Sequence, residues 1–235
     1  MDTFEMKVIA RIRSDFKTKF GIPRQSGLVE ELTATVVFEP EFRDPEALRG
    51  IEGFSHLWLI WQCSENVRED WAPTVRPPRL GGNVRMGVFA TRSPFRPNAL
   101  GLSCVKLIAV EQDAVSGPVL LVAGADLMDS TPIFDIKPYL PYADCVPEAL
   151  SGFAPDAGRV LRVEFAAGEK EKLPPEKLDA LSAVLANDPR PRYQHDAQRV
   201  YFLDFAGYEI KFRVSDDLLQ VVEVKKQNNE NDRRI

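Results

Sequence analysis

The sequence has few of the residues from which metal centres and disulfide frameworks are built. Its 235 residues include 3 cysteines and 2 histidines, and no two cysteines form a Cys-x-x-Cys pair. An odd number of widely spaced cysteines argues against both a disulfide framework and a zinc site, and two histidines argue against a histidine-rich centre. We therefore expect a protein without a bound metal.

Long hydrophobic runs are absent as well. No apolar stretch approaches the roughly 18 residues that a membrane-spanning helix requires, and the N-terminus lacks a basic segment followed by an apolar one. With 44% hydrophobic and 28% charged residues, the composition is that of an ordinary globular protein with a full core. The expectation is a cytoplasmic protein that makes no membrane contact.

The two common nucleotide-binding motifs are also missing. No G-x-G-x-x-G follows a strand pattern and opens a helix, and no G-x-x-x-x-G-K-[ST] is present, so a bound nucleotide would not be held in the Rossmann manner. The first 150 residues instead contain short strand patterns separated by turn residues, which is typical of a mainly β barrel or sandwich. The expected strands span residues 6–14, 32–39, 54–61, 84–91, 101–111, 119–125 and 133–140.

The character of the chain changes after about residue 151. Leu178, Leu181, Val184 and Leu185 recur at helical spacing, with prolines before and after them, and predict a helix over 174–187. Strand patterns follow at 200–205, 208–214 and 218–224. We therefore expect a β-barrel domain at 1–150, a small C-terminal α+β domain at 151–224 and a polar tail at 225–235.

Cationic charge is concentrated between Trp71 and Lys106, although the formal net charge of the chain is −5. This stretch contains no aspartate or glutamate, and it is rich in proline and glycine, which suit a shaped loop. Its positively charged residues are Arg76, Arg79, Arg85, Arg92, Arg96 and Lys106. The pattern predicts an anion-binding loop system. The alternative is a pair of turns flanking one buried strand, with the arginines merely exposed.

Three further features are candidates for ligand contact, and each has a structural alternative. Arg24 and Gln25 follow Pro23 on a loop stiffened by proline, which suits ligand contact but also occurs in plain turns. Segment 126–135 places three aspartates around a turn, where such side chains commonly bond the backbone. His56 lies in an apolar strand pattern, where it can be a core residue or a catalyst.

Four segments together resemble the TrmO (TsaA-like) family. They are F-G-I-P-R-Q-S-G-L, R-G-I-E-G-F-S-H-L-W, V-R-P-P-R-L-G-G-N-V-R-M-G-V-F-A-T-R-S-P-F-R-P-N and D-I-K-P-Y-L-P-Y-A-D. The resemblance covers residues 6–149, and D-P-R-P-R-Y at 188–193 is similar to the C-terminal extension of bacterial members. One departure is Ser130, where the family more often has glycine in an Asp-Gly-Thr-Pro turn. Serine is the costlier residue there if the position needs a positive φ.

The resemblance implies a tRNA methyltransferase that uses S-adenosylmethionine and methylates the exocyclic N6 of threonylcarbamoyladenosine next to the anticodon of threonine tRNA. It also implies a non-Rossmann β-barrel that binds S-adenosylmethionine, and a homodimer whose site uses residues of both subunits. The residues that it implies around the donor are Pro23, Arg24, Gln25, Ser55, His56, Arg92, Leu102, Asp126, Leu127, Asp129, Ser130 and Thr131.

This chemistry suits the composition of the chain. Methyl transfer from a sulfonium needs positioning in a dry pocket rather than a metal or a covalent nucleophile. The proton of the acceptor nitrogen must leave, and Asp129, Asp126 and His56 are the candidate bases. The acceptor carries a threonine carboxylate, for which Arg92 or Arg96 offers two parallel donors. The remaining arginines, with Lys17, Lys19 and Arg24, could neutralise tRNA phosphates.

Two other functions stay open from the sequence. One is a non-catalytic RNA-binding or regulatory module, in which the arginines bind RNA and the turn at 126–135, the aspartate turn, has only a structural role. The other is a small-molecule hydrolase that uses the aspartates. Binding of S-adenosylmethionine, measured by calorimetry, separates a methyltransferase from the RNA-binding module.

Overall fold

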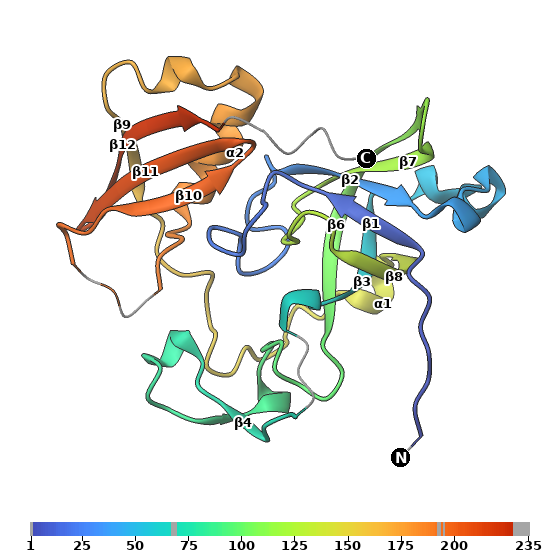
Figure 1. Cartoon of the computed structure of the whole chain (residues 1–235). Helices are drawn as coiled ribbons and strands as arrows, with labels where there is room; N and C mark the ends of the chain where they lie inside the picture. Colours follow the sequence, from blue (N-terminus) through green and yellow to red (C-terminus); the bar gives the residue numbers. More distant parts are fainter. Residues whose placement is uncertain (1, 67–69, 192–193, 195, 228–235) are drawn as a thin grey trace.

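The computed structural model describes residues 2–66, 70–191, 194 and 196–227, and within them the N-terminal part forms a closed antiparallel barrel (Figure 1). Its strands are β1 (Ala10–Arg13), β2 (Thr33–Phe38), β3 (His56–Gln62), β6 (Leu100–Asp113), β7 (Gly117–Ala123) and β8 (Pro132–Pro138). They lie in the order β1-β2-β7-β6-β3-β8, and the ring closes because β1 pairs with both β2 and β8. The predicted mainly β, non-Rossmann fold is confirmed.

The barrel is built by side chains that alternate between its interior and its surface. Along β2, exposed or half-buried positions alternate with buried ones, as the period of a strand requires. Val36, Leu57 and Leu59 are completely buried in one apolar cluster inside the ring. Short 3-10 turns at Pro40–Phe42, Pro45–Leu48 and Ile51–Gly53 connect β2 to β3 on the outside.

Between β3 and β6 the chain leaves the barrel as an arm, which we define as residues 70–99. The arm contains β4 (Thr74–Val75), β5 (Met86–Gly87) and 3-10 turns at Pro78–Leu80 and Val88–Ala90, and Figure 1 shows it projecting below the barrel. The strand predicted at 84–91 is therefore wrong over most of its length. β4 offers only two partner residues, so β5 ends at Gly87 and the chain turns back toward the barrel.

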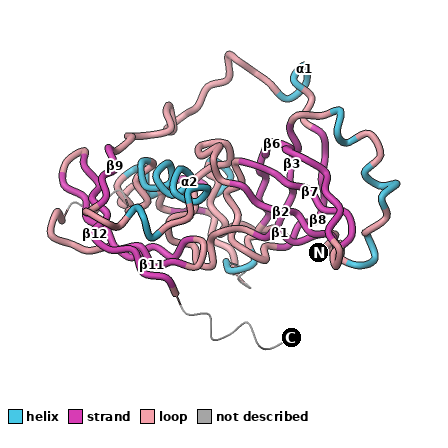
Figure 2. Tube along the Cα trace, turned by 90° about the horizontal axis from the view of Figure 1, so that it is seen from above, coloured by secondary structure: helices cyan, strands magenta, loops and turns pink. Residues whose placement is uncertain are grey.

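The C-terminal unit is a sheet in the order β10-β11-β12-β9 with one longer helix, and it lies beside the barrel (Figure 2). Its elements are β9 (Arg162–Phe165), α2 (Pro175–Ala186), β10 (Tyr201–Phe205), β11 (Tyr208–Ser215) and β12 (Leu218–Lys226). The helix and the last three strands are confirmed, although β12 reaches two residues into the predicted tail. Two short elements, β9 and α1 (Pro141–Asp144), were not predicted. β9 pairs in parallel with the distant β12, which no local pattern shows.

None of the helices in the described ranges combines the length and the apolar character that crossing a membrane requires. The longest, α2, has 12 residues and turns Leu181 and Leu185 into the core of the C-terminal unit.

The loop between β1 and β2 packs into the C-terminal unit although it belongs to the barrel in sequence. Phe16, Val29 and Leu32 are buried in the same apolar cluster as α2 and β10 to β12. Gly21, with φ of 92°, lies so close to Leu203 of β10 that an added Cβ would be 2.2 Å from the Cδ1 atom of Leu203. A division of the chain at residue 150 therefore separates the two sheets but not the side chains of this loop.

Candidate active site

A cavity of about 410 Å³ opens where the β1–β2 loop, the arm and the barrel meet. Four segments that are far apart in sequence line it, namely parts of 19–25, 61–65, 91–102 and 126–131. Of the residues predicted around the donor, those that line the cavity are Pro23, Arg24, Gln25, Arg92, Leu102, Asp126 and Thr131. The arginine-rich arm and the aspartate turn are thus brought together by the fold.

Asp126 lines this cavity and accepts the last hydrogen bond of a chain that runs from Trp61 through Ser103. Its Oδ1 accepts a hydrogen bond of 2.5 Å from Ser103 Oγ, and Ser103 in turn accepts one of 2.9 Å from Trp61 Nε1. Burial raises the pKa of Asp126 above its ordinary value, and the hydrogen bond from Ser103 and the charge of Arg92 oppose this only in part. A desolvated carboxylate of this kind favours a bound cation.

The position of Trp61 depends on a glycine across the sheet. β3 and β6 pair Trp61 with Gly101, and an added Cβ on Gly101 would lie 2.2 Å from the indole ring. Because Gly101 has no side chain, the indole can lie against the backbone of β6. This close approach places the indole N–H beside Ser103 and so completes the chain to Asp126.

A second chain of polar contacts joins the arm to the β1–β2 loop. Arg92 Nη1 donates to Gln25 Oε1, and Gln25 Nε2 donates to the carbonyl oxygen of Arg24. Arg24 Nη2 in turn donates to the carbonyl oxygen of Arg190 at 2.8 Å and to that of Asp188 at 3.4 Å. The predicted loop residues 24 and 25 are thus held from the arm on one side and from the C-terminal unit on the other.

Arg96 lines the same cavity from the end of the arm. Its Nη1 donates to the carbonyl oxygen of Thr91 at 2.8 Å, a contact that fixes the side chain and leaves other N–H groups of the guanidinium for a ligand. Near it lies Cys63, whose pKa is raised by burial and by the charge of Asp126, against the influence of Arg96 and Lys19. The cysteine is therefore a neutral thiol at physiological pH and not an activated nucleophile.

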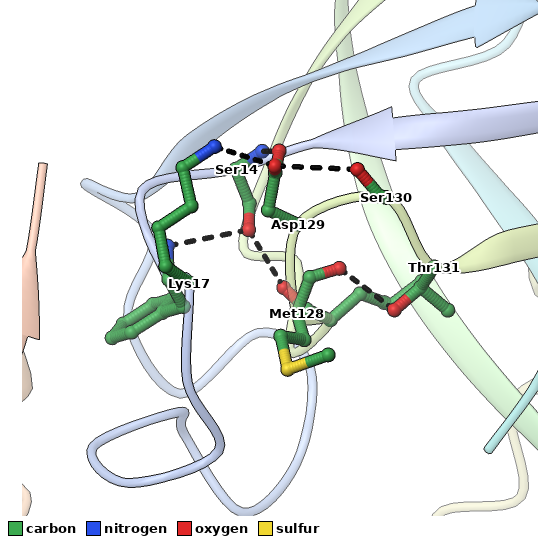
Figure 3. A network of polar contacts seen from close by, with 8 residues as sticks. Ser14, Lys17, Met128, Asp129, Ser130 and Thr131 are labelled. Atoms are coloured by element: carbon green, nitrogen blue, oxygen red, sulfur yellow. Dashed lines mark hydrogen bonds and ion pairs between the residues drawn. The ribbon is translucent and has the colours of Figure 1, made fainter. Parts of the chain in front are cut away.

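Asp129 is not part of the cavity lining, and Figure 3 shows its carboxylate directed toward Ser14 and Lys17. Its carboxylate accepts hydrogen bonds from the backbone N–H of Ser14 at 3.0 Å and from Lys17 Nζ at 2.6 Å. Ser130 Oγ donates to the same carboxylate at 3.3 Å. Asp129 thus connects the turn to the chain that follows β1. This contact matches the alternative reading of the sequence, in which the aspartates of the turn bond the backbone. Its proposed role as a base stays a prediction.

The neighbours of Asp129 on this turn also have structural contacts. Leu127 is buried in the barrel core, and its carbonyl oxygen accepts a hydrogen bond of 2.9 Å from Ser14 Oγ. Thr131 Oγ1 donates to the carbonyl oxygen of Met128 at 2.7 Å (Figure 3). Ser130 has a φ of 64°, so this position does adopt the left-handed conformation. Serine is therefore a costlier residue here than the glycine that the family more often has.

The Ser130→Gly variant is expected to raise the free energy of unfolding by about 0.5–1 kcal/mol, because glycine adopts a positive φ without steric cost. Urea unfolding monitored by tryptophan fluorescence measures the change. Ser151→Gly is the matched control: Ser151 is exposed and is not among the residues with positive φ. This control should be neutral or slightly destabilising. A Ser130→Gly variant no more stable than the parent would contradict the strain assigned to Ser130.

Ser55 and His56 lie at the opposite end of β3 from the cavity. His56 and Trp61 are five positions apart on β3, which at about 3.3 Å per residue is roughly 16 Å. Ser55 Oγ and His56 Nδ1 are 2.9 Å apart, and the imidazole packs edge-on to Tyr139 with ring centroids 6.2 Å apart. Within a single chain, this pair and the cavity are therefore distinct places.

Several residues of the site were not singled out from the sequence. Among them are Trp61, Gln62, Cys63, Gly101 and Ser103. Trp61 and Gln62 end β3, and Cys63 follows it. Ligand sites often lie where strands end, so the location of these residues was a usable signal. Ser103 and Gly101 carry no such signal, because their importance comes from the register of β6 against β3.

In the described part of the chain, no group of three or more histidine, cysteine, aspartate or glutamate side chains is arranged to hold a metal ion. Cys63, Cys104 and Cys145 are all free. The polar groups that the cavity presents are thus carboxylate, guanidinium, ammonium and thiol.

Two family models match the chain and divide it between the barrel and the C-terminal unit. The model described as the tRNA-methyltransferase O N-terminal domain matches residues 11–145, and the one described as the TrmO C-terminal domain matches residues 159–227.

Two curated relatives and one solved structure match over most of the chain. The tRNA (adenine(37)-N6)-methyltransferase of Escherichia coli (strain K12) is 41% identical over 227 residues, which cover 92% of this chain and 95% of that protein. A putative S-adenosylmethionine-dependent methyltransferase of Pseudomonas aeruginosa is 40% identical over 201 residues, covering 82% of this chain and 84% of that protein. The crystal structure of TrmO from Pseudomonas aeruginosa has a TM-score of 0.78 at 32% identity and covers 95% of this chain and 98% of that one.

Proposed function

The chain belongs to the TrmO family of tRNA methyltransferases, and we propose that it methylates N6 of threonylcarbamoyladenosine beside the anticodon of threonine tRNA, with S-adenosylmethionine as the donor. The observation that carries the proposal is one cavity that holds a desolvated carboxylate, Asp126, together with Arg92 and Arg96. The carboxylate suits a cationic donor, and the guanidinium groups suit an anionic acceptor. A tRNA substrate would support a cytoplasmic location.

The residues of the cavity fit S-adenosylmethionine. Asp126 loses hydration on folding, and a positively charged ligand offsets that loss. Ile22, Pro23, Leu100 and Met128 provide apolar surface for an adenine ring. When bound, the donor supplies a methyl group that its positively charged sulfur already activates. The work left to this chain is to orient the two reactants and to exclude water.

The arginines supply a site for the acceptor. Its threonine carboxylate matches the two parallel N–H donors of a guanidinium, and the Arg96 side chain is already fixed by its own loop. Its urea-like nitrogen must lose a proton, and two carboxylates line the cavity, those of Asp126 and Glu65. We assign the proton to Asp126, because burial raises its pKa toward the range of a useful base. Asp126 therefore has two compatible tasks: it balances the charge of the donor, and it accepts the proton directly or through one water.

The same proposal includes a homodimer in which a second copy completes the site. The outer face of β6 supports it: Leu100, Leu102 and Ile108 are 39%, 56% and 47% exposed. Leu100 and Leu102 are two residues apart and form part of the rim of the cavity, and Ile108 lies further along the same strand. Exposed apolar side chains of this kind suit a contact strip between two chains. A second chain packed on this strip would bring further residues to the cavity, and Ser55 and His56 are the ones that the family resemblance implies.

Mass analysis of tRNA nucleosides tests the function. Cells that lack this protein should accumulate threonylcarbamoyladenosine and lose its methylated form, and the purified chain with S-adenosylmethionine should restore the methyl group in vitro. Unchanged nucleosides in both experiments would refute the proposed activity. Calorimetry with S-adenosylmethionine alone then tells whether the donor binds, which the alternative of an RNA-binding module does not require.

Arg96→Ala is expected to lower turnover on threonylcarbamoyl tRNA by about 10- to 100-fold while the affinity for S-adenosylmethionine changes little, because a charge-assisted bidentate contact is worth about 1.5–3 kcal/mol. Arg96→Lys keeps the charge but lacks the two parallel N–H donors of the guanidinium, so it should recover only part of the rate. Steady-state kinetics and calorimetry make the comparison. Turnover equal to that of the parent would exclude the role of Arg96.

A further inference from the structure

The arm carries an exposed aromatic pair that belongs neither to the barrel core nor to the cavity lining. The rings of Trp71 and Phe89 stack with centroids 6.0 Å apart and planes inclined by 29°. Trp71 is 50% exposed and Phe89 is 71% exposed. Two large apolar side chains gathered at the surface point to a contact with another molecule, because folding alone does not favour their exposure.

The backbone of the arm fixes this pair in place. β4 and β5 pair over two residues each, and the contact continues through a hydrogen bond of 2.9 Å from the backbone N–H of Val88 to the carbonyl oxygen of Pro73. Val88 is only 1% exposed, so it anchors this end of the arm. The two rings lie just beyond this anchor, at positions 71 and 89, and form a platform with a defined orientation.

Arg96 connects the platform to the cavity. Its guanidinium carbon lies 5.9 Å from the centroid of the Phe89 ring, and the same side chain lines the cavity. The hydrogen bond from Arg96 to the carbonyl oxygen of Thr91 holds the guanidinium between the two places. A group stacked on Phe89 would therefore be a close neighbour of whatever occupies the cavity.

The charge around the platform indicates what kind of molecule would bind. The arm contains five arginines and one acidic residue, Asp70, which directly precedes Trp71. Arg76 and Arg85 are exposed on this arm. Aromatic rings interleaved with cationic groups are the elements of single-stranded nucleic-acid sites, in which bases stack on the rings and phosphates meet the cations. A second copy of this chain would bring an equally basic arm against this one, and that repulsion disfavours self-association here.

We propose that Trp71 and Phe89 form a stacking platform for an unpaired anticodon-loop base next to the target adenosine. This inference rests on the proposed function, and it adds a base-binding surface outside the cavity. A base held on Phe89 fixes the register of the loop, so that the adjacent modified adenosine reaches the cavity beside Arg96. Arg76 and Arg85 would contribute contacts to the phosphates.

The test uses the full chain and an anticodon stem–loop RNA of threonine tRNA with 2-aminopurine in place of a base that neighbours the target. Stacking quenches the fluorescence of 2-aminopurine, so binding to the parent protein should quench it. Phe89→Ala should lose most of this quench and bind the RNA about 5- to 100-fold more weakly, since base–aromatic stacking contributes about 1–3 kcal/mol. Phe89→Tyr keeps a ring and should behave like the parent.

Salt dependence separates stacking from charge. Phe89→Ala should leave the slope of log Kd against log salt concentration unchanged, whereas Arg85→Ala should lower the slope by about one unit and keep the quench. S-adenosylmethionine affinity should be the same for Phe89→Ala and the parent.

Three results would overturn the inference. One is a Phe89→Ala variant that keeps both RNA affinity and quench. Another is a Phe89→Ala variant that loses donor binding or changes its sedimentation coefficient, because the pair would then support the fold or a contact between copies. If the parent neither binds the stem–loop nor methylates tRNA, the proposed function fails, and the platform fails with it.

Discussion

Asp126→Asn is expected to abolish most activity while making the apo protein more stable. The carboxylate is desolvated in the cavity, and replacing it with a neutral amide removes the counter-charge for a cationic donor. Loss of one partner of a buried charge pair typically costs about 2–5 kcal/mol, so the affinity for S-adenosylmethionine should fall by about 30- to 5000-fold. Isothermal titration calorimetry measures it. Asp135→Asn, which changes a half-exposed carboxylate of β8, is the control and should bind the donor normally.

The same substitution has a pH-dependent effect on stability, whose sign follows from the raised pKa of Asp126. A carboxyl whose pKa rises on folding stabilises the fold fully below the pKa of the unfolded chain, about 3.9, and this contribution is lost as the pH rises through the folded pKa. The amide that replaces it never ionises, so at neutral pH the free energy of unfolding of the variant should exceed that of the parent by on the order of 1 kcal/mol. The difference should vanish near pH 4. Thermal unfolding at both pH values checks this.

Donor binding by the parent should show the opposite trend with pH. A cationic ligand prefers the ionised carboxylate, so its affinity should weaken as the pH falls through the raised pKa of Asp126. The Asp126→Asn variant should show no such decline. Equal donor affinity of variant and parent at neutral pH would remove Asp126 from the site.

Gly21→Ala is expected to damage both the fold and the cavity, although Gly21 itself does not line the cavity. Alanine at a φ of 92° is strained by about 1–2 kcal/mol, and its Cβ would overlap Leu203, which adds about 1–3 kcal/mol. The overlap would push the β1–β2 loop away from the C-terminal unit and shift Pro23 to Gln25. Displacement of a positioning group by about 1 Å can cost about 100-fold in rate. Urea unfolding and methylation kinetics give the two readouts.

Gly27 provides the matched control on the same loop. It has a φ of 76°, and an added Cβ would meet nothing within 4 Å, so Gly27→Ala should show the backbone cost alone. A double variant, Gly21→Ala with Leu203→Ala, should cost less than the sum of the single changes, because the new methyl group enters the vacated space. Additive costs, or equal effects at both glycines, would show that contact with Leu203 does not position the loop.

Local patterns were sufficient for most of the strands and for the helix of the C-terminal unit. Alternation along β2 and helical spacing in α2 are properties of neighbouring residues, and the structure has both elements. The strand predicted at 84–91 was wrong because pairing depends on the length of the partner, and β4 has only two residues. β9 was missed because its pairing partner β12 is remote in sequence, so no local pattern shows the pair.

For the candidate site, the motifs identified the segments but not the direction of each side chain. Asp126 and Asp129 lie three residues apart on one turn, and no pattern in the residue order separates their roles. In the structure, Asp126 faces Ser103 and the cavity, whereas Asp129 faces Ser14 and Lys17 on the other side. Which carboxylate meets the ligand is therefore a consequence of how the turn crosses the end of β1.

By itself, the sequence determined the fold class, the family and the concentration of arginines on one acid-free segment, because these are written in residue order and spacing. Only the tertiary structure decided that the arm, the β1–β2 loop and the aspartate turn share one cavity, and that the C-terminal unit supports the loop. The physical reason is that burial, a raised pKa and a close contact such as that of Gly21 with Leu203 are properties of pairs of segments. They come into existence only when distant parts of the chain are packed together.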